Sequence, residues 1–178
     1  SSDVCSSDLL GAKASSSHTG ALAGSDAAYE ALFKQARMIR AKNLKELLDL
    51  LAVFSSNTLP RGNRLGIITN AGGLGVLATD AAIASGLALA SLSDTTKKKL
   101  ALLPDAASKQ NPVDVLGDAL ADRYRIALDA VLSDPEVDMI LVMVTPQTMT
   151  QAKETAEAII DAKSMTDKPV VAIFSGKD

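Results

Sequence analysis

The feature that most constrains the fold is a regular alternation of short apolar segments with longer amphipathic segments over residues 63–178. The apolar segments have the length of β-strands and lie at 65–69, 87–92, 138–145 and 170–174. The segments between them have helical length and repeat apolar residues every three or four positions. This alternation predicts βαβ units, and therefore a doubly wound parallel sheet with right-handed crossovers. The expected fold class is α/β, and we expect a fifth full strand to be missing.

Composition excludes several classes of protein. Hydrophobic residues make up 47% of the chain and charged residues 22%, which is typical of a folded protein. The net charge of -3 with dispersed Lys and Arg argues against nucleic-acid binding. No apolar run reaches the ~18 residues that a membrane-spanning helix needs. Cys5 is the single cysteine and His18 the single histidine, so an internal disulfide and a Cys/His zinc cluster are excluded. We expect a cytoplasmic protein, with no metal bound by its own residues.

Changes in composition divide the chain into four segments. Residues 1–9 are polar, lack periodicity and resemble the translated read-through of a sequencing adapter, so we expect them to be non-native. Residues 10–56 begin with a loop rich in Ser, Ala and Gly, which is followed by two helical segments. Residues 57–62 have the composition of a linker. Residues 63–178 carry the strand–helix alternation and form the main domain.

Several helix boundaries can be placed from local signals. Ser25 or Asp26 can cap a first helix, and Leu44, Leu47, Leu48 and Leu51 mark a second, amphipathic one. Ser93 or Asp94 can cap a further helix, and Gly86 suits the position just after a helix end. Thr148 and Gln151 have the spacing of a capping box, which predicts a helix over 148–163.

A glycine-rich turn follows the strand at 65–69 and leads into a helix. Its sequence is Asn70-Ala71-Gly72-Gly73-Leu74-Gly75. Main-chain N–H groups at such a helix start have no acceptor and, with the helix dipole, favour an anion. We therefore predict phosphate binding at Asn70, Gly72, Gly73 and Leu74. The alternative is that the small residues only let the helix pack closely on the strand. No Lys-Ser or Lys-Thr follows the glycines, so the turn is not a Walker loop.

His18 lies in a loop of small residues. By composition alone, a lone loop histidine is more often a solvent-exposed bystander than a catalytic group. Its small neighbours leave the imidazole accessible, however, and a histidine that attacks a phosphoryl group needs that access. Asp114 and Asp118 flank Gly117 and could contact a substrate or a metal, with turn capping as the alternative.

Three motifs occur in a fixed order. They are Ser-His-Thr-Gly-Ala-Leu-Ala-Gly-Ser-Asp at 17–26, Thr-Asn-Ala-Gly-Gly-Leu-Gly-Val at 69–76 and Asn-Pro-Val-Asp at 111–114. In this order they resemble the NDP-forming acyl-CoA synthetases, that is, the ADP-forming acetate–CoA ligases related to succinyl-CoA synthetase. The resemblance extends over residues 11–178.

The resemblance implies a phosphohistidine enzyme with His18 as the phosphorylated residue. Acyl-CoA and phosphate would give acyl phosphate and free CoA, and His18 would then take the phosphoryl group and pass it to ADP. The turn at 70–74 resembles one of two helix N-termini that hold the phosphohistidine in this family. Asn111 and Asp114 become candidate substrate-site residues. Residues 10–56 would end one flavodoxin-like domain, with a short strand at Met38–Arg40, and 63–178 would form most of the next.

The resemblance also implies cofactors and partners. CoA and ATP or ADP with Mg would bind mainly to a CoA-binding Rossmann domain and an ATP-grasp domain or subunit, neither of which lies in this chain. An oligomer is expected, and the chain alone is expected to be inactive. Two alternatives remain: a regulatory domain of a protein lysine acetyltransferase, which often lacks the histidine, and a non-catalytic flavodoxin-like module, with which FMN should copurify.

Overall fold

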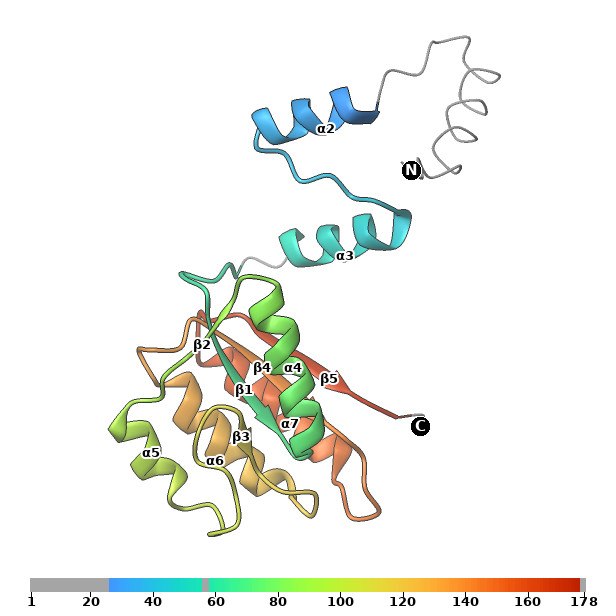
Figure 1. Cartoon of the computed structure of the whole chain (residues 1–178). Coiled ribbons are helices and arrows are strands. Elements are labelled where there is room, and N and C mark those ends of the chain that lie inside the picture. The colour runs from blue at the N-terminus through green and yellow to red at the C-terminus, as the bar shows by residue number, and fades with distance from the viewer. Residues whose placement is uncertain (1–25, 56–57, 177–178) are drawn as a thin grey trace, which may run out of the picture. The chain divides into compact units, whose positions relative to one another are not determined.

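The structure is a computed structural model that describes residues 26–55 and 58–176. The chain divides into two compact units, Ser1–Ser55 and Ser56–Asp178. In the first unit the described residues form helix α2 (Asp26–Gln35) and helix α3 (Leu44–Ser55), shown in blue and cyan in Figure 1. Neither helix buries a side chain among these residues, and four leucines of α3 are exposed: Leu44, Leu47, Leu48 and Leu51.

The expected strand at Met38–Arg40 is not formed. These residues are irregular, and the side chains of Met38 and Ile39 are exposed. A strand needs a neighbouring strand for its main-chain hydrogen bonds, and none lies beside this segment within residues 26–55. Arg40 instead makes ion pairs with Asp26 and Glu30 of α2.

The second unit is a parallel α/β fold, as the sequence predicts. Its elements are β1 (Arg64–Thr69), α4 (Gly72–Ala84), β2 (Ala88–Leu89), α5 (Asp94–Leu100), β3 (Val113–Asp114), α6 (Ala121–Leu132), β4 (Met139–Val144), α7 (Ala152–Ser164) and β5 (Val170–Phe174). The strands are parallel in the order β2-β1-β4-β5. The short β3 pairs with the carboxyl half of β1, on the side where β2 pairs with its amino half.

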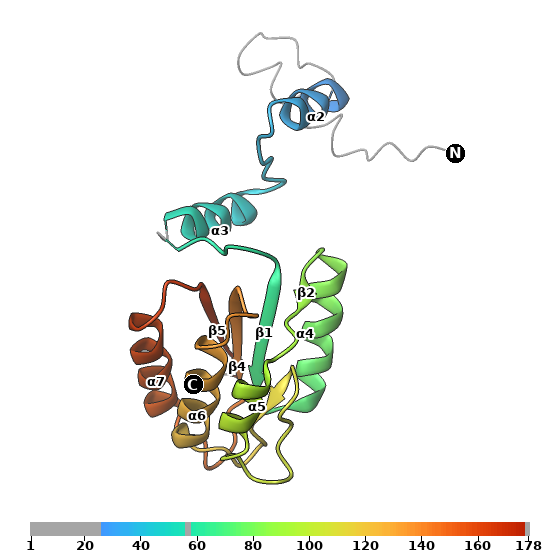
Figure 2. The ribbon, with the colours of Figure 1, turned by 90° about the vertical axis from the view of Figure 1, so that its left-hand side faces the viewer.

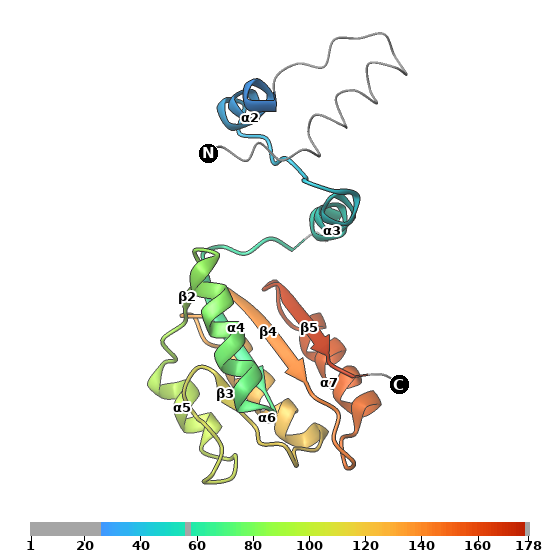
Figure 3. The same cartoon turned by 45° about the vertical axis from the view of Figure 1, so that its right-hand side comes forward.

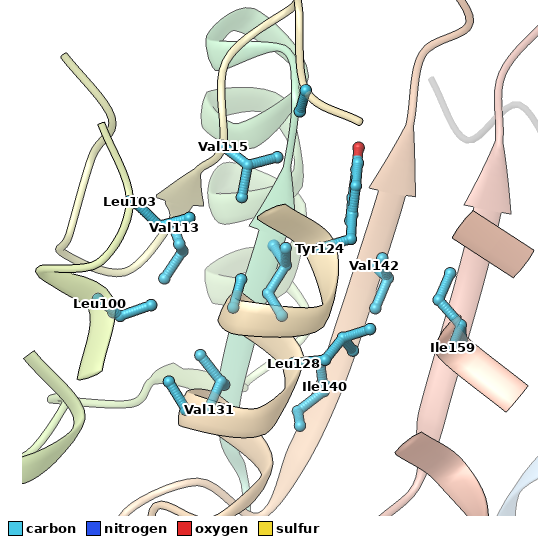
Figure 4. Packing of buried hydrophobic residues seen from close by; sticks show 14 of the residues in the cluster. Leu100, Leu103, Val113, Val115, Tyr124, Leu128, Val131, Ile140, Val142 and Ile159 are labelled. Atoms are coloured by element: carbon cyan, nitrogen blue, oxygen red, sulfur yellow. The ribbon is translucent and has the colours of Figure 1, made fainter. Parts of the chain in front are cut away.

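Helices cover the two faces of the sheet unequally. In Figure 2, α6 and α7 lie on one side of the sheet and α4 on the other; α5 packs against α6, on the side of α6 and α7. The main core lies under the three helices, where Tyr124 and Leu128 of α6 pack with Ile140 and Val142 of β4 (Figure 4). A smaller cluster under α4 joins Ile67, Ala82 and Met143. Beside α4, the faces of β4 and β5 carry no described helix (Figure 3), and Ile173 is 47% exposed.

Local signals place most helix ends correctly. Ser93 is the N-cap of α5, and its side chain accepts a hydrogen bond from the N–H of Thr96. Gly86 follows α4 with a φ of +82°, a conformation that glycine adopts without strain. Helix α6 closes at Leu132, before Asp134 and Pro135, as expected.

Two predicted boundaries are wrong. Helix α7 begins at Ala152 and not at Thr148, because the Gln151 side chain does not cap its own helix. Its oxygen Oε1 instead accepts a hydrogen bond of 3.3 Å from the N–H of Ala121, at the start of α6. The strand predicted at 87–92 is reduced to β2, because the carbonyl of Ala90 bonds to the side chain of Asn111 and β3 takes the next place beside β1.

Candidate functional site

Most of the described candidate residues lie near the carboxyl end of β1, which pairs with β4 on one side and with β3 on the other. From β1 the chain passes to β2 on one side of that strand, and it later returns to β4 on the other side. The strand order therefore reverses between β1 and β4, and open α/β sheets bind ligands at such a switch point, beyond the carboxyl ends of the strands. The turn after β1 and the loop after β4 flank this position.

The start of α4 presents main-chain donors without partners. Its N-cap, Ala71, is extended and provides no side-chain cap. The first helical hydrogen bond runs from the N–H of Gly75 to the carbonyl of Ala71, at 3.1 Å. Within the described chain, the N–H groups of Gly72, Gly73 and Leu74 have no acceptor. Three free donors at the positive end of a 13-residue helix form an arrangement that suits an anion. We call residues 70–74 the anion turn.

The glycines of this turn do not share one role. A Cβ placed on Gly75 would lie 3.2 Å from Cγ2 of Thr69 and 3.4 Å from Cβ of Pro112, so Gly75 serves close packing. A Cβ on Gly73 would have nothing within 4 Å. The alternative, that the small residues only serve helix–strand packing, therefore accounts for Gly75 and does not account for Gly73.

Asn70 is 3% exposed, and both polar atoms of its side chain are bonded. Its Nδ2 donates to the carbonyl of Thr145 at 2.8 Å, and its Oδ1 accepts from the N–H of Thr145 at 2.8 Å. This pair of bonds uses one of the two N–H groups of Nδ2, so phosphate binding by the second N–H of Asn70 stays a prediction. The side chain thus joins the anion turn to the loop after β4.

Asn111 and Asp114 lie on the side of β1 away from β4: Asp114 is in β3, and Asn111 is two residues before that strand. They line a pocket of about 430 Å³ together with Gly72, Ser108 and others. The side-chain amide of Asn111 is hydrogen-bonded within the sheet: it bonds to the main chain of Ile67, Leu65 and Ala90 at 2.8–3.0 Å.

The Asp114 carboxylate faces the start of α4. Its Oδ1 accepts from the N–H of Leu116 at 2.9 Å, and its Oδ2 lies 3.2 Å from the place of a Cβ on Gly72. The free oxygen of this half-buried carboxylate thus lies near the donors of the anion turn.

Tyr124 lies behind the switch point and is fully buried. Its hydroxyl donates to the carbonyl of Met143 at 3.1 Å, and its oxygen is visible at the end of the ring in Figure 4. Burial, and next the charge of Asp114, raise the pKa of Tyr124. A neutral, fully buried phenol of this kind supports the core and does not transfer protons.

The sequence analysis did not single out two further residues at the carboxyl ends of strands, Thr145 and Ser175. Each directly follows a strand, and their hydroxyl oxygens are 3.2 Å apart. The rule that ligands bind beyond the carboxyl ends of parallel strands would have found both positions.

His18 and the rest of its motif up to residue 25 lie outside the described residues. In residues 26–55 and 58–176, no three His, Cys, Asp or Glu side chains are grouped so that they could hold a metal ion. The helices of the same ranges include none that is long and apolar enough to cross a bilayer.

Two family models match the chain. Residues 6–54 match the succinyl-CoA ligase-like flavodoxin domain, and residues 65–178 match the ligase-CoA domain. The first match begins inside the segment 1–9 that was expected to be non-native. The space between the matches includes the expected linker at 57–62.

Similar proteins are ADP-forming ligases. The chain is 39% identical to 4-hydroxybutyrate–CoA ligase [ADP-forming] of Nitrosopumilus maritimus, over 94% of this chain and 24% of that protein. It is 40% identical to acetate–CoA ligase [ADP-forming] II subunit alpha of Pyrococcus furiosus, over 92% of this chain and 37% of that subunit. The chain therefore spans about a quarter to a third of the length of these relatives.

A solved structure of a similar enzyme has the same fold over most of this chain. The dinucleotide-forming acetyl-coenzyme A synthetase 1 of Candidatus Korarchaeum cryptofilum, in complex with phosphate and ADP, matches 95% of this chain with a TM-score of 0.85 and 35% identity. The match covers 37% of that protein. From these matches and the parallel α/β fold, we conclude that the chain belongs to the succinyl-CoA-ligase-like family of ADP-forming acyl-CoA ligases.

Proposed function

We propose that this chain is the part of an ADP-forming acyl-CoA ligase in which a phosphoryl group moves through His18 and is held at the anion turn. The reaction would convert acyl-CoA, ADP and phosphate into the free acid, CoA and ATP, in either direction. The observation that carries the proposal is the uncapped start of α4 beside the switch point. There the space next to Gly73 is unoccupied, and three main-chain N–H groups have no acceptor in the described chain.

Each step places negative charge where the anion turn can stabilise it. A phosphate oxygen attacks the thioester carbonyl, the C–S bond breaks, and CoA leaves as the thiol. A nitrogen of His18 then attacks the phosphorus of the acyl phosphate, and the P–O bond to the acyl group breaks to release the carboxylate. A terminal oxygen of ADP finally takes the phosphoryl group from His18. The N–H groups of Gly72, Gly73 and Leu74 would bind the phosphoryl oxygens throughout.

Asn70 and Asp114 have supporting roles in this proposal. Asn70 would hold the turn in place through its bonds to Thr145, and the second N–H of its amide would donate to the phosphoryl group. The Asp114 carboxylate lies beside Gly72 and would repel a phosphate dianion. A cation that accompanies the phosphoryl group would offset this repulsion, so the site would bind the phosphoryl group together with its cation. Asn111 would position the segment that carries Asp114.

Other parts of the parent protein would supply the remaining chemistry. Mg²⁺ with ATP or ADP, and CoA, would bind mainly to an ATP-grasp domain or subunit and to a CoA-binding domain. The relative from Pyrococcus furiosus is named as a subunit alpha, which supports a division of the work between chains or domains. We propose that the parent protein is an oligomer of the cytoplasm and that this chain alone is inactive.

The test is a thiol-release assay on the full-length protein that contains this chain. Acetyl-CoA should yield free thiol only when phosphate is present, because the C–S bond is broken by phosphate and not by water. Release beyond one equivalent per site should also need ADP, which removes the phosphoryl group from His18. His18→Ala should abolish the ADP-dependent synthesis of ATP. Thiol release that needs neither ADP nor phosphate would contradict the proposal, as would ATP synthesis that survives His18→Ala.

A further inference from the structure

A cavity of about 610 Å³ lies at the end of the sheet opposite the anion turn. The segment before β1, the residues around the start of β4 and the turn between α7 and β5 form its walls. Figure 2 shows these segments at the amino ends of the parallel strands, whereas α4 starts at the carboxyl end of β1. We call it the amino-end cavity. The proposed reaction gives it no role.

The Lys168 ammonium lines this cavity and has no anionic partner among the described residues. Its Nζ donates to the carbonyl of Leu132 at 2.8 Å and to the carbonyl of Asp134, just beyond the end of α6. Within the described chain, its third N–H has no acceptor and no carboxylate forms an ion pair with it. Burial lowers the pKa of Lys168, and the more distant charges of Asp134 and Asp138 do not offset this effect. An anion in the cavity would accept the third N–H and compensate the buried charge.

Arg61 provides a second cation that a ligand can use. Its side chain is 87% exposed, and its ion pair with the equally exposed Asp167 is 3.9 Å long. Such a pair contributes little to stability and is easily exchanged for another anion. Arg64 also lines the cavity, but its guanidinium already has two carboxylate partners. The available cationic groups are therefore Lys168 and Arg61.

An apolar groove between α6 and α7 continues from the amino-end cavity. The groove has a volume of about 330 Å³, and Met165 and Thr166 line both the groove and the cavity. The side chain of Met165 is 85% exposed, and methionine adapts its shape to apolar ligands. Apolar side chains of the two helices line the groove: Leu128, Leu132, Ala158 and Ala162. A polar cavity with two available cations thus opens onto an apolar groove.

The charges of the lining residues favour a ligand with a single negative charge. The carboxylates of Asp138 and Asp167 line the cavity and would repel a second negative charge on a ligand. The acidic residues of the groove, Asp129 and Asp161, are each paired with a cation. A monoanion with an apolar body therefore fits better than a phosphate dianion.

We propose that the amino-end cavity and the groove between α6 and α7 form one binding site for a small monocarboxylic acid with an apolar chain. The carboxylate would accept hydrogen bonds from Lys168 and Arg61, and the apolar chain would lie beside Met165 in the groove. Both volumes lie in the range of about 300–1,000 Å³ that is usual for small-molecule sites. This site is separate from the anion turn and does not depend on the proposed function.

The experiment titrates the complete 178-residue chain with hexanoate and follows the main-chain amide signals in NMR spectra. Hexanoate should shift the signals of residues 165–168 and of Leu128 and Leu132. Acetate has the carboxylate without the chain, and hexanol has the chain without the charge. Each should bind at these residues at least about tenfold more weakly than hexanoate. Inorganic phosphate should leave these signals unchanged and shift those of Gly72–Leu74.

A surface variant tests the cationic end of the site. Arg61→Gln should weaken hexanoate binding about threefold or more, because it removes an exposed cation of the site and leaves the core intact. Lys153→Gln is the matched control, because Lys153 is as exposed, pairs with Glu157 and lies outside both the cavity and the groove. Its hexanoate affinity should equal that of the wild type.

Two further variants test the buried cation and the apolar chain. Lys168→Met should weaken hexanoate binding about tenfold. Because Lys168 also bonds to the carbonyls beyond α6, an unfolding curve of this variant accompanies the titration. Met165→Gln should weaken the binding of hexanoate and leave that of acetate unchanged, because acetate does not reach the groove.

Several outcomes would overturn the site. Hexanol or phosphate that binds at residues 165–168 as tightly as hexanoate would do so, as would hexanoate affinity that Arg61→Gln leaves unchanged. If Lys168→Met does not fold, Arg61→Gln and the comparison with hexanol still decide. Phosphate that leaves Gly72–Leu74 unshifted would count against the proposed function alone, and hexanoate binding at residues 165–168 would still support this site.

Discussion

The side-chain oxygen of Asn111 accepts a hydrogen bond of 2.9 Å from the main-chain N–H of Ile67, in the middle of β1. The nitrogen of the same side chain donates to the carbonyls of Leu65 at 2.8 Å and Ala90 at 3.0 Å. The amide therefore takes the place of strand main chain between β2 and β3, where the sheet would otherwise have a gap. The edge of the sheet behind the anion turn depends on this one side chain.

Asn111→Ala should destabilise the second unit by about 2–4 kcal/mol, because it leaves buried main-chain groups of Ile67 and Ala90 without partners. Urea unfolding followed by circular dichroism measures the loss. Asn63→Ala, which removes an exposed amide at the other end of β1, should cost about 0.5 kcal/mol or less. Equal losses in the two variants would show that the Asn111 amide does not replace strand main chain.

Gly73 and Gly75 should respond in opposite ways to the same substitution. Gly75→Val places its side chain against Thr69 and Pro112 and should cost about 1–3 kcal/mol through overpacking. Gly73→Val meets open space, so stability should change by about 0.5 kcal/mol or less. The valine should nevertheless obstruct the approach of phosphate to the main chain. Unfolding curves and phosphate titrations of both variants provide the test, and phosphate affinity that Gly73→Val leaves unchanged would contradict the anion turn.

Asp138 should make stability depend on pH in the acid range. Hydrogen bonds from Arg64 lower the pKa of Asp138 to about 2. The carboxylate receives the N–H of Arg64 at 3.0 Å and its guanidinium at 2.9 Å, which joins the start of β1 to the start of β4. Since the folded pKa lies below the unfolded value of about 3.9, this stabilisation is complete above about pH 4 and is lost as the pH falls towards 2.

Asp138→Asn should therefore be less stable than the wild type at pH 7, and the difference between the two should shrink below about pH 4. Thermal unfolding at a series of pH values measures this. Asp118→Asn is a suitable comparison, because Asp118 pairs with Arg123 and is 55% exposed. A difference between Asp138→Asn and the wild type that stays constant from pH 7 to pH 2 would contradict the assignment.

Local patterns predicted the parts of the fold that depend on neighbouring residues. The apolar runs of β1 and β4 and the turn before α4 are read correctly because period and glycine content are local properties. The errors come from side chains whose partners are distant in sequence. Asn111 reaches back to Ala90 and shortens the strand predicted at 87–92, and Gln151 bonds to Ala121 instead of capping α7.

The candidate site shows the same division. The free donors of the anion turn follow from the sequence of a strand, a glycine turn and a helix. The role of the Asn70 side chain does not, because its partner, Thr145, is 75 residues away along the chain. No local pattern distinguishes an asparagine that binds an anion from one that holds two loops together.

The measurement that tests the central claim most directly is phosphoryl transfer to His18. The full-length protein that contains this chain is incubated with labelled ATP and Mg²⁺, and the label is located by peptide mapping. The label should lie on His18, be labile in acid and stable in base, and disappear when ADP is added. Label that persists in His18→Ala would contradict the account, as would a wild-type protein that acquires no label while it makes acyl-CoA.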